Sequence, residues 1–236
     1  MNSEPHNLFL IKEEQIQNSQ IILTGSEYHH IKNVLRKKPG DIIYLTDGSG
    51  IQFQVVIENI IQNAMVCKIL EKRKIPRTNI INLDLGIAPL KGGRTDFIIE
   101  KGTELGVRKF ILFNSKFSVI KNFSQARIEH FKRIGISAML QSQQYYIPEV
   151  KFSNDITEEF SNYDLVIVGD KNGNDRIVPG IKNILLLIGP EGGFAPEEID
   201  AFSKKGAKFT PFSKNRLRSE TAAIAGIVKI ISYYEQ

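Results

Sequence analysis

Two short segments in the second half of the chain carry the residues best suited to holding a small ligand. Residues 189–194, which read Gly-Pro-Glu-Gly-Gly-Phe, directly follow the apolar run 184–188. Residues 217–223, which read Leu-Arg-Ser-Glu-Thr-Ala-Ala, open the last predicted helix. A buried strand that ends in glycines places bare backbone amides at the carboxyl edge of a sheet, where open α/β folds bind ligands. The sequence therefore predicts a ligand pocket at these two segments.

The common nucleotide-binding loops do not account for this pocket. The chain has no G-x-G-x-x-G after the first strand of its α/β half and no G-x-x-x-x-G-K-[ST] anywhere. Residues 189–194 include no lysine for phosphate, which favours a ligand with a purine end and an amino acid end over a triphosphate. For this loop taken alone, a tight turn before a helix beginning at Pro196 is the alternative.

Short apolar runs separated by turn residues occupy the first 73 residues. We expect strands at residues 21–23, 42–45, 53–57 and 64–69. The apolar spacing in residues 26–36 predicts one short helix that ends near Pro39 and Gly40. These features are typical of a small β-barrel.

A polar, charged segment with a proline follows and marks a domain boundary. The predicted organisation is a first domain at residues 1–73, a linker at 74–79 and a second domain at 80–236. In the second domain we expect strands at residues 81–87, 109–113, 164–169, 184–188 and 208–212. We expect helices at residues 95–105, 124–139 and 196–202, and a last helix with its apolar face at Ile224, Ile227, Val228 and Ile231. This alternation predicts an α/β domain with a mostly parallel sheet.

Composition narrows the class of protein. The chain has 236 residues, of which 42% are hydrophobic, enough for a real core. No apolar stretch approaches the roughly 20 residues that span a bilayer, and no leader is evident, so we expect a cytoplasmic protein without a membrane partner. The single cysteine, Cys67, excludes an internal disulfide, and the four histidines form no metal-ligand pattern, so we expect no metal.

The net charge of +5 favours an anionic partner. Basic residues cluster at 36–38 and 72–74 and alternate at Lys214, Arg216 and Arg218. Each cluster could contact phosphate, although a short basic run taken alone is more often a solvated surface. Together they favour RNA as the partner.

Taken together, the motifs along the chain resemble those of the RsmE family of ribosomal RNA methyltransferases, which are SPOUT-type enzymes. The resemblance covers nearly the whole length. It rests on His30, residues 34–36, Gly40, Asp41, residues 47–50, Lys91, residues 100–107, Gln141, Ser142, Pro148, and the segments 189–193 and 217–222. The Glu-Leu-Gly-Val and Leu-Arg-Ser-Glu-Thr-Ala strings select this branch, because similar glycine loops occur in SPOUT enzymes that methylate ribose.

The resemblance implies a PUA-like, RNA-binding β-barrel at the N-terminus and a C-terminal SPOUT α/β domain with a trefoil knot. It implies transfer of a methyl group from S-adenosylmethionine to N3 of one uridine in the 16S small-subunit rRNA. It also implies a homodimer with its active site at the subunit interface, and small-subunit rRNA or an assembled 30S particle as the substrate.

On this resemblance, we assign the cofactor to backbone groups of the glycine loop and its neighbours, namely Gly169, Leu187, Gly189, Pro190, Gly192, Gly193 and Leu217. N3 of uridine carries a proton, and its loss leaves an anion that a cation or a base beside the ring would help to form. Arg218 is expected to steady this anion or a phosphate. Glu220 is expected to orient the ring or accept the proton, with helix capping as the alternative. RNA contacts are expected at Arg36, Lys91, Arg94, Lys214 and Arg216.

Two positions depart from the family pattern. Phe117 and Gln144 stand where relatives usually carry arginine, so neither is assigned a phosphate contact. Two other functions stay open on the sequence. One is a SPOUT methyltransferase acting on another RNA position, such as a ribose 2′-hydroxyl. The other is a catalytically silent RNA-binding ribosome-assembly factor, which the two missing arginines suggest.

Overall fold

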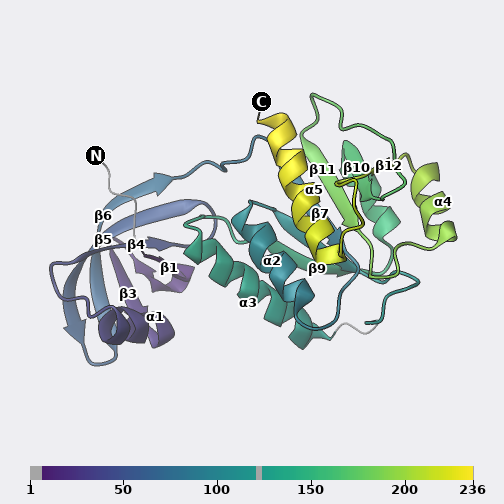
Figure 1. Ribbon diagram of the computed structural model, residues 1–236. Helices are drawn as coiled ribbons and strands as arrows, with labels where there is room; N and C mark the ends of the chain where they lie inside the picture. The colour runs from purple at the N-terminus through teal and green to yellow at the C-terminus, as the bar shows by residue number, and fades with distance from the viewer. Residues whose placement is uncertain (1–6, 121–123, 236) are drawn as a thin grey trace. The chain divides into compact units, whose positions relative to one another are not determined.

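The computed structural model describes residues 7–120 and 124–235. The chain divides into two compact units (Figure 1). The first runs to Arg77 and also includes Met139–Ile147, and the second comprises Thr78–Ala138 and the residues from Pro148 onward.

The described part of the first unit contains one curled six-stranded sheet, a half-barrel (Figure 1). Its strands, in spatial order, are β1 (Leu8–Leu10), β4 (Ile42–Thr46), β5 (Ile51–Ile61), β6 (Ala64–Lys74), β3 (Gln20–Thr24) and β2 (Ile16–Gln17). β1 and β4 are parallel and the other pairs antiparallel. Alternate residues of β5, namely Phe53, Val55 and Ile57, enter the core, as the two-residue period of a strand requires. The strands predicted from the sequence are confirmed.

Two details of this unit differ from the sequence prediction. β6 continues to Lys74, which the sequence placed in the linker, because Arg73 and Lys74 pair with β5 residues and the ladder outweighs their polar character. The predicted helix at 26–36 divides into α1 (Gly25–His29) and a π-helical turn (His30–Val34).

A distant segment completes the first unit. Residues 139–147 lie against the turn at residues 47–50, where the Gly50 amide donates to the Tyr145 carbonyl at 2.7 Å and the Ile147 amide donates to the Gly48 carbonyl at 2.9 Å. A Cβ atom at Gly48 or Gly50 would lie within 2.4 Å of a side chain of this segment, and both glycines have positive φ. The glycines in this turn are therefore required by close packing as well as by backbone conformation.

The described part of the second unit is built on a six-stranded sheet in which every pair is parallel, where the sequence predicted a mostly parallel sheet. In spatial order the strands are β12 (Lys208–Thr210), β10 (Leu165–Gly169), β11 (Asn183–Ile188), β7 (Asn82–Ile87), β8 (Lys109–Phe113) and β9 (Glu149–Ser153). For β9 the sequence predicted no element. The helices are α2 (Arg94–Glu104), α3 (Gln125–Gln141), η3 (Ile156–Asn162, 3₁₀), α4 (Pro196–Lys204) and α5 (Ser219–Tyr234).

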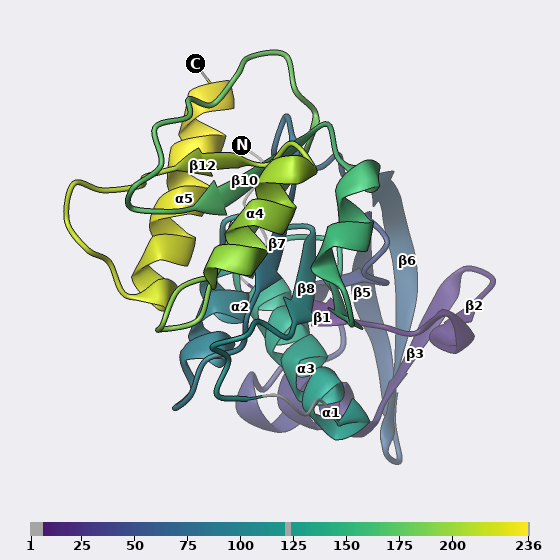
Figure 2. The ribbon, with the colours of Figure 1, turned by 90° about the vertical axis from the view of Figure 1, so that its right-hand side faces the viewer.

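Both faces of this sheet are covered, which explains its fully apolar strands. Along β11, Ile184 and Leu186 face a core shared with α2, α3 and α5, whereas Leu185 and Leu187 face a second core shared with η3 and α4. Figures 1 and 2 show α2 and α5 on one face and α4 on the other.

The apolar face predicted for the last helix is partly wrong. The buried residues of α5 are Ala223, Gly226, Ile227 and Ile230, while Ile224 and Ile231 are only partly buried and Val228 is 44% exposed. A Cβ atom at Gly226 would lie 2.8 Å from the Phe212 ring. The helix approaches the sheet through its small residues, and hydrophobicity alone did not identify this face.

A charged network lies near the amino end of β7, where Asp84 is buried and the Arg108 side chain is 32% exposed. The Asp84 carboxylate is fully buried and accepts hydrogen bonds from Arg108 at 2.9 and 2.8 Å and from the Tyr163 hydroxyl at 2.7 Å. The hydrogen bond to Asp84 raises the pKa of Arg108, and burial together with Asp84 raises the pKa of Tyr163. Each donor is therefore held in its protonated form.

Replacing Asp84 with alanine should lower the free energy of unfolding by about 3 kcal/mol, because Arg108 and Tyr163 lose their buried acceptor. Urea titration measures the change. Asp96→Ala is the matched control, since Asp96 pairs with His130 at 3.1 Å on the surface, and it should cost less than about 1 kcal/mol. Equal losses for both variants would contradict a structural role specific to Asp84.

Candidate active site

A pocket of about 960 Å³ lies in the second unit at the carboxyl ends of neighbouring strands. β10 ends at Gly169, β11 ends at Ile188, and the chain leaving β7 reaches α2 at Arg94. These three strands are adjacent in the sheet, close to the point where the strand order reverses, which is where α/β folds bind ligands. The volume suits a small organic molecule.

The glycine loop after β11 forms one wall of this pocket. Gly189, Pro190, Glu191, Gly192, Gly193 and Phe194 all line it. The Gly193 amide donates to the Pro190 carbonyl at 2.9 Å, and Gly193 has a φ of +76°, which favours glycine. A Cβ atom at Gly189 would lie 3.2 Å from the Phe194 ring. The loop is thus a tight turn and also a ligand wall, so the two interpretations of its sequence are compatible.

Phe194 holds the loop against the core below it. Its ring stacks on Phe113 at a centroid distance of 6.3 Å and meets Phe202 edge-on at 5.1 Å. On the outer side, Phe117 approaches the loop, and a Cβ atom at Gly192 would lie 3.2 Å from the Cβ of Phe117. The loop is therefore packed on both sides.

A second wall follows β10 and was identified from the sequence only at Gly169. Asp170, Lys171 and Asn172 also line the pocket. The Asp170 carboxylate accepts from the Asn172 amide at 2.8 Å, which fixes the turn. The available signal was the run of polar residues directly after a fully apolar strand, the same pattern that marks the loop after β11.

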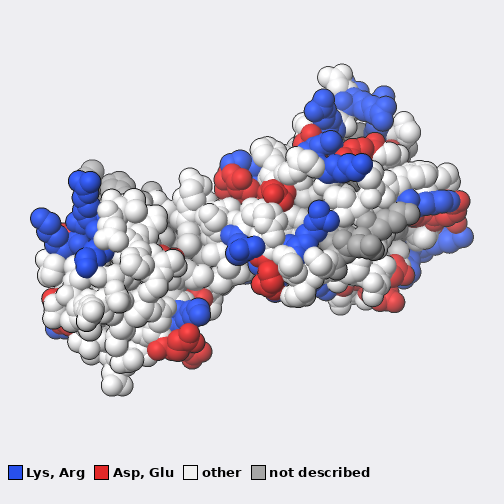
Figure 3. Space-filling view, turned by 90° about the horizontal axis from the view of Figure 1, so that it is seen from below, with Lys and Arg blue, Asp and Glu red and all other residues white. Residues whose placement is uncertain are grey.

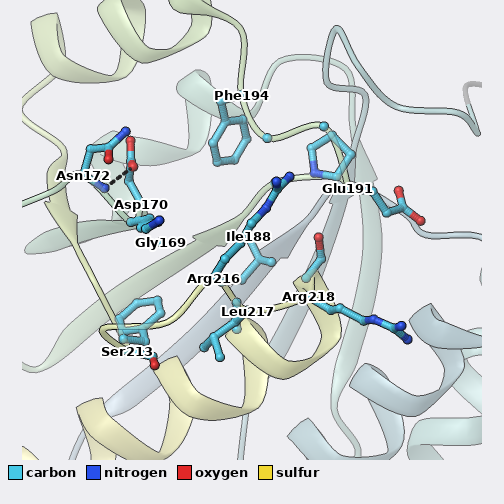
Figure 4. A pocket seen from close by; sticks show the side chains of 18 of the residues that line it. Gly169, Asp170, Asn172, Ile188, Glu191, Phe194, Ser213, Arg216, Leu217 and Arg218 are labelled. Atoms are coloured by element: carbon cyan, nitrogen blue, oxygen red, sulfur yellow. Dashed lines mark hydrogen bonds between the residues drawn. The ribbon is translucent and has the colours of Figure 1, made fainter.

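The third wall is the segment that leads from β12 into α5. It contributes Phe212, Ser213, Asn215, Arg216, Leu217, Arg218, Ser219 and Ala222. In Figure 4, Phe194 and Glu191 lie across the pocket from Leu217 and Arg218, and the side chain of Arg216 runs between the two sides. A Cβ atom at Gly169 would lie 2.8 Å from the Phe212 ring, so the second and third walls touch at this aromatic side chain.

Arg94 links two walls through carboxylates. Its Nη1 lies 3.1 Å from Oε1 of Glu191 and 4.0 Å from Oε2 of Glu220. Glu220 itself is not a lining residue, although its neighbours Arg218 and Ser219 are. Among the described residues, Oε2 of Glu220 is buried and has no hydrogen-bond partner.

The remaining predicted residues lie elsewhere. The side chain of Leu187 is buried in the core on the α4 side and does not line the pocket. Lys91 and Lys214 are exposed outside the pocket wall. Arg36 is an exposed residue of the first unit with a φ of +54°.

Charge in the pocket suits a ligand with an anionic part. The described lining residues include the cations Arg94, Lys171, Arg216 and Arg218 and the acids Asp170 and Glu191. On the face drawn in Figure 3, Lys and Arg form separate groups with Asp and Glu among them. On that face the cations therefore do not form one continuous basic surface.

The described residues offer neither a metal-ligand cluster nor a reactive cysteine. Across residues 7–120 and 124–235, no group of three His, Cys, Asp or Glu residues could hold a metal ion. Burial raises the pKa of Cys67 to about 12, with a further contribution from Glu58, so this cysteine is a core thiol and not a nucleophile. No helix in the same residues is long and apolar enough to cross a membrane.

Comparison with protein families gives two matches. Residues 77–231 match a family described as an RNA methyltransferase domain, and residues 23–70 match one described as an RNA methyltransferase PUA domain.

Relatives and solved structures are similar over nearly the whole chain. The chain is 28% identical to a ribosomal RNA small subunit methyltransferase E of Rickettsia conorii, with 95% of each chain covered. It is 26% identical to the Bacillus subtilis protein of the same name, with 94% of each covered. A crystal structure of a ribosomal RNA small subunit methyltransferase E from Neisseria gonorrhoeae bound to S-adenosyl methionine has a TM-score of 0.86 at 24% identity, covering 97% of this chain and 98% of that one.

Proposed function

Since the chain belongs to the RNA methyltransferase family, we propose that it transfers the methyl group of S-adenosylmethionine to N3 of one uridine in small-subunit ribosomal RNA. The observation that carries this proposal is the pocket in which the glycine loop after β11 faces the segment containing Arg218. The near full-length similarity to methyltransferase E proteins supports the RsmE branch and the rRNA substrate.

The pocket fits the proposed cofactor. Its volume of about 960 Å³ accommodates a molecule with a purine and an amino acid end, and exposed Gly192 and Gly193 offer backbone groups for polar contacts. We assign the cofactor to Gly169, Gly189, Pro190, Gly192, Gly193 and Leu217, with Leu187 supporting the strand from behind. S-adenosylmethionine supplies an activated methyl group, so the protein mainly has to position the two reactants.

Arg218 is the residue proposed to steady the uridine. Loss of the N3 proton leaves a negative charge spread over the ring and its carbonyls, and a cation fixed beside the ring stabilises it. Arg218 is exposed in the pocket wall, immediately before the first residue of α5. Glu220 is proposed to orient the segment that carries Arg218, because its Oε2 is buried and the residue does not line the pocket.

Other parts of the proposal concern the partner and the assembly. N3 lies on the Watson–Crick edge, so the target uridine must be unpaired or displaced. RNA contacts are proposed at Arg36 in the half-barrel, and at Lys91, Lys214 and Arg216 near the pocket. We further propose a cytoplasmic homodimer and a knotted SPOUT backbone, on the family resemblance.

Methyl transfer to small-subunit particles from cells that lack this protein tests the function. Labelled S-adenosylmethionine should yield 3-methyluridine at one position after digestion of the rRNA. A ribose-methylated nucleoside would assign the chain to the alternative SPOUT activity. Cofactor binding without any incorporation would favour the silent assembly factor, which the exposed, uncharged Phe117 also suggests.

Gly192→Val should reduce the affinity for S-adenosylmethionine at least about tenfold. Gly192 lies in the pocket wall with Phe117 close behind it, so a branched side chain at this position must displace the glycine loop or enter the pocket. Isothermal titration calorimetry measures the affinity, and thermal melting establishes that the variant is folded. Unchanged affinity in a folded variant would argue against this loop as the cofactor wall.

Arg218→Ala should reduce methyl transfer at least about 100-fold, because a charge stabiliser of the reacting base is lost. The affinity of this variant for the cofactor should stay within about threefold of the wild-type value. The reason is that Arg218 is proposed to stabilise charge that develops on the RNA base during the reaction. Lys204→Ala is the control, because Lys204 is an exposed α4 residue paired with Asp200 at 2.6 Å. An equal loss of cofactor binding and methyl transfer in Arg218→Ala would contradict this role.

A further inference from the structure

Arg94 occupies a position that a cation does not favour on local grounds. It is the first residue of α2, where the positive end of the helix dipole repels a guanidinium. Two carboxylates offset this cost, since Nη1 lies 3.1 Å from Glu191 and 4.0 Å from Glu220. These carboxylates come from the glycine loop and from α5, so three separate segments converge on one guanidinium nitrogen.

Among the residues that the structure describes, the carboxylate partners of this guanidinium lie at Nη1, which leaves its other two nitrogens for a ligand. Arginine has five N–H donors in a planar fork, and the carboxylates of Glu191 and Glu220 both approach Arg94 at Nη1. The Arg94 side chain lines the pocket and is 37% exposed. Anchoring one nitrogen limits the motion of a long side chain, so its other donors point in a restricted direction.

Glu220 is placed to hold this arginine. Its side chain is only 16% exposed, its Oε2 is buried without a hydrogen-bond partner in the described chain, and it does not line the pocket. It lies in the first turn of α5, where a carboxylate is stabilised by the helix amides. A buried carboxylate behind the wall can orient a cation in the wall more readily than it can contact a base inside the pocket.

We propose that Arg94 is a second catalytic cation, which donates to a carbonyl oxygen of the uridine anion, and that Glu191 and Glu220 are positioning residues that act through it. This inference rests on the proposed function. In the reaction the N3–H bond breaks and its proton passes to water. The bond between N3 and the methyl carbon then forms as the methyl–sulfur bond breaks. The electron pair of the broken bond stays on sulfur. Arg94 stabilises the charge on the ring and takes no proton.

A double-mutant cycle tests whether Glu220 acts through Arg94. In single-turnover assays, Arg94→Ala should lower the rate about 100-fold and Arg94→Lys should restore about tenfold of that loss, since an ammonium keeps the charge. Glu220→Gln should lower the rate about tenfold in the wild-type background and cause no further loss in Arg94→Ala. Glu191→Gln should behave in the same way. If Arg94→Ala does not fold, Arg94→Gln, which keeps a long polar side chain without the charge, replaces it in both cycles.

Lys101→Ala is the matched control on α2. Lys101 pairs with Glu100 and Glu104 at 2.8 Å and does not line the pocket, so this change removes the same charge without a change in rate. Affinity for S-adenosylmethionine should stay within about threefold in every variant, because the proposed role is on the RNA base.

Two results would overturn the inference while leaving the proposed function intact. If Glu220→Gln lowers the rate equally in the wild-type and Arg94→Ala backgrounds, Glu220 acts on the substrate directly and is the base. If Arg94→Ala raises KM for the particle, leaves kcat unchanged and reduces the salt dependence, Arg94 binds phosphate. Absence of methyl transfer by the wild-type protein would overturn the proposed function together with this inference.

Discussion

Parallel pairing of three strands determines where chemistry can occur in this protein. β11 lies between β10 and β7, so all three strands end at the same edge of the sheet. The glycine loop, the polar turn at Asp170 and the start of α2 consequently surround one volume. Without this shared edge, residues 94, 170 and 191 would belong to unrelated parts of the surface.

Close packing then gives the pocket its shape. Phe212 fills the space beside Gly169 and beside Gly226, where any side chain at either glycine would collide with its ring. Phe194 similarly ties the glycine loop to the aromatic side chains of the second core. The walls are therefore set by large side chains meeting positions without side chains, and interiors packed at this density tolerate few alternatives.

The arrangement of charge follows from the same framework. Arg94 can approach both Glu191 and Glu220 only because α2 and α5 pack on one face of the sheet and the glycine loop lies at its edge. The sequence assigned Arg94 to RNA contact, together with Lys91 and the basic residues from Lys214 onward, because two arginines usual in the family are missing. Its two carboxylate partners are 97 and 126 positions away in the chain, so no local pattern could indicate the pairing.

The sequence by itself determined the fold class of each unit and most of the strands and helices. It also identified the two segments that face each other in the pocket. These follow from local periodicity and from glycines whose backbone must turn sharply, and the family resemblance named the cofactor and substrate. Tertiary structure decided what depends on distant contacts: the return of residues 139–147 to the first unit, the buried face of α5, and the burial of Glu220 behind Arg94. In each case the controlling interaction joins residues far apart in the chain, and its energy comes from packing and charge pairing that no single segment encodes.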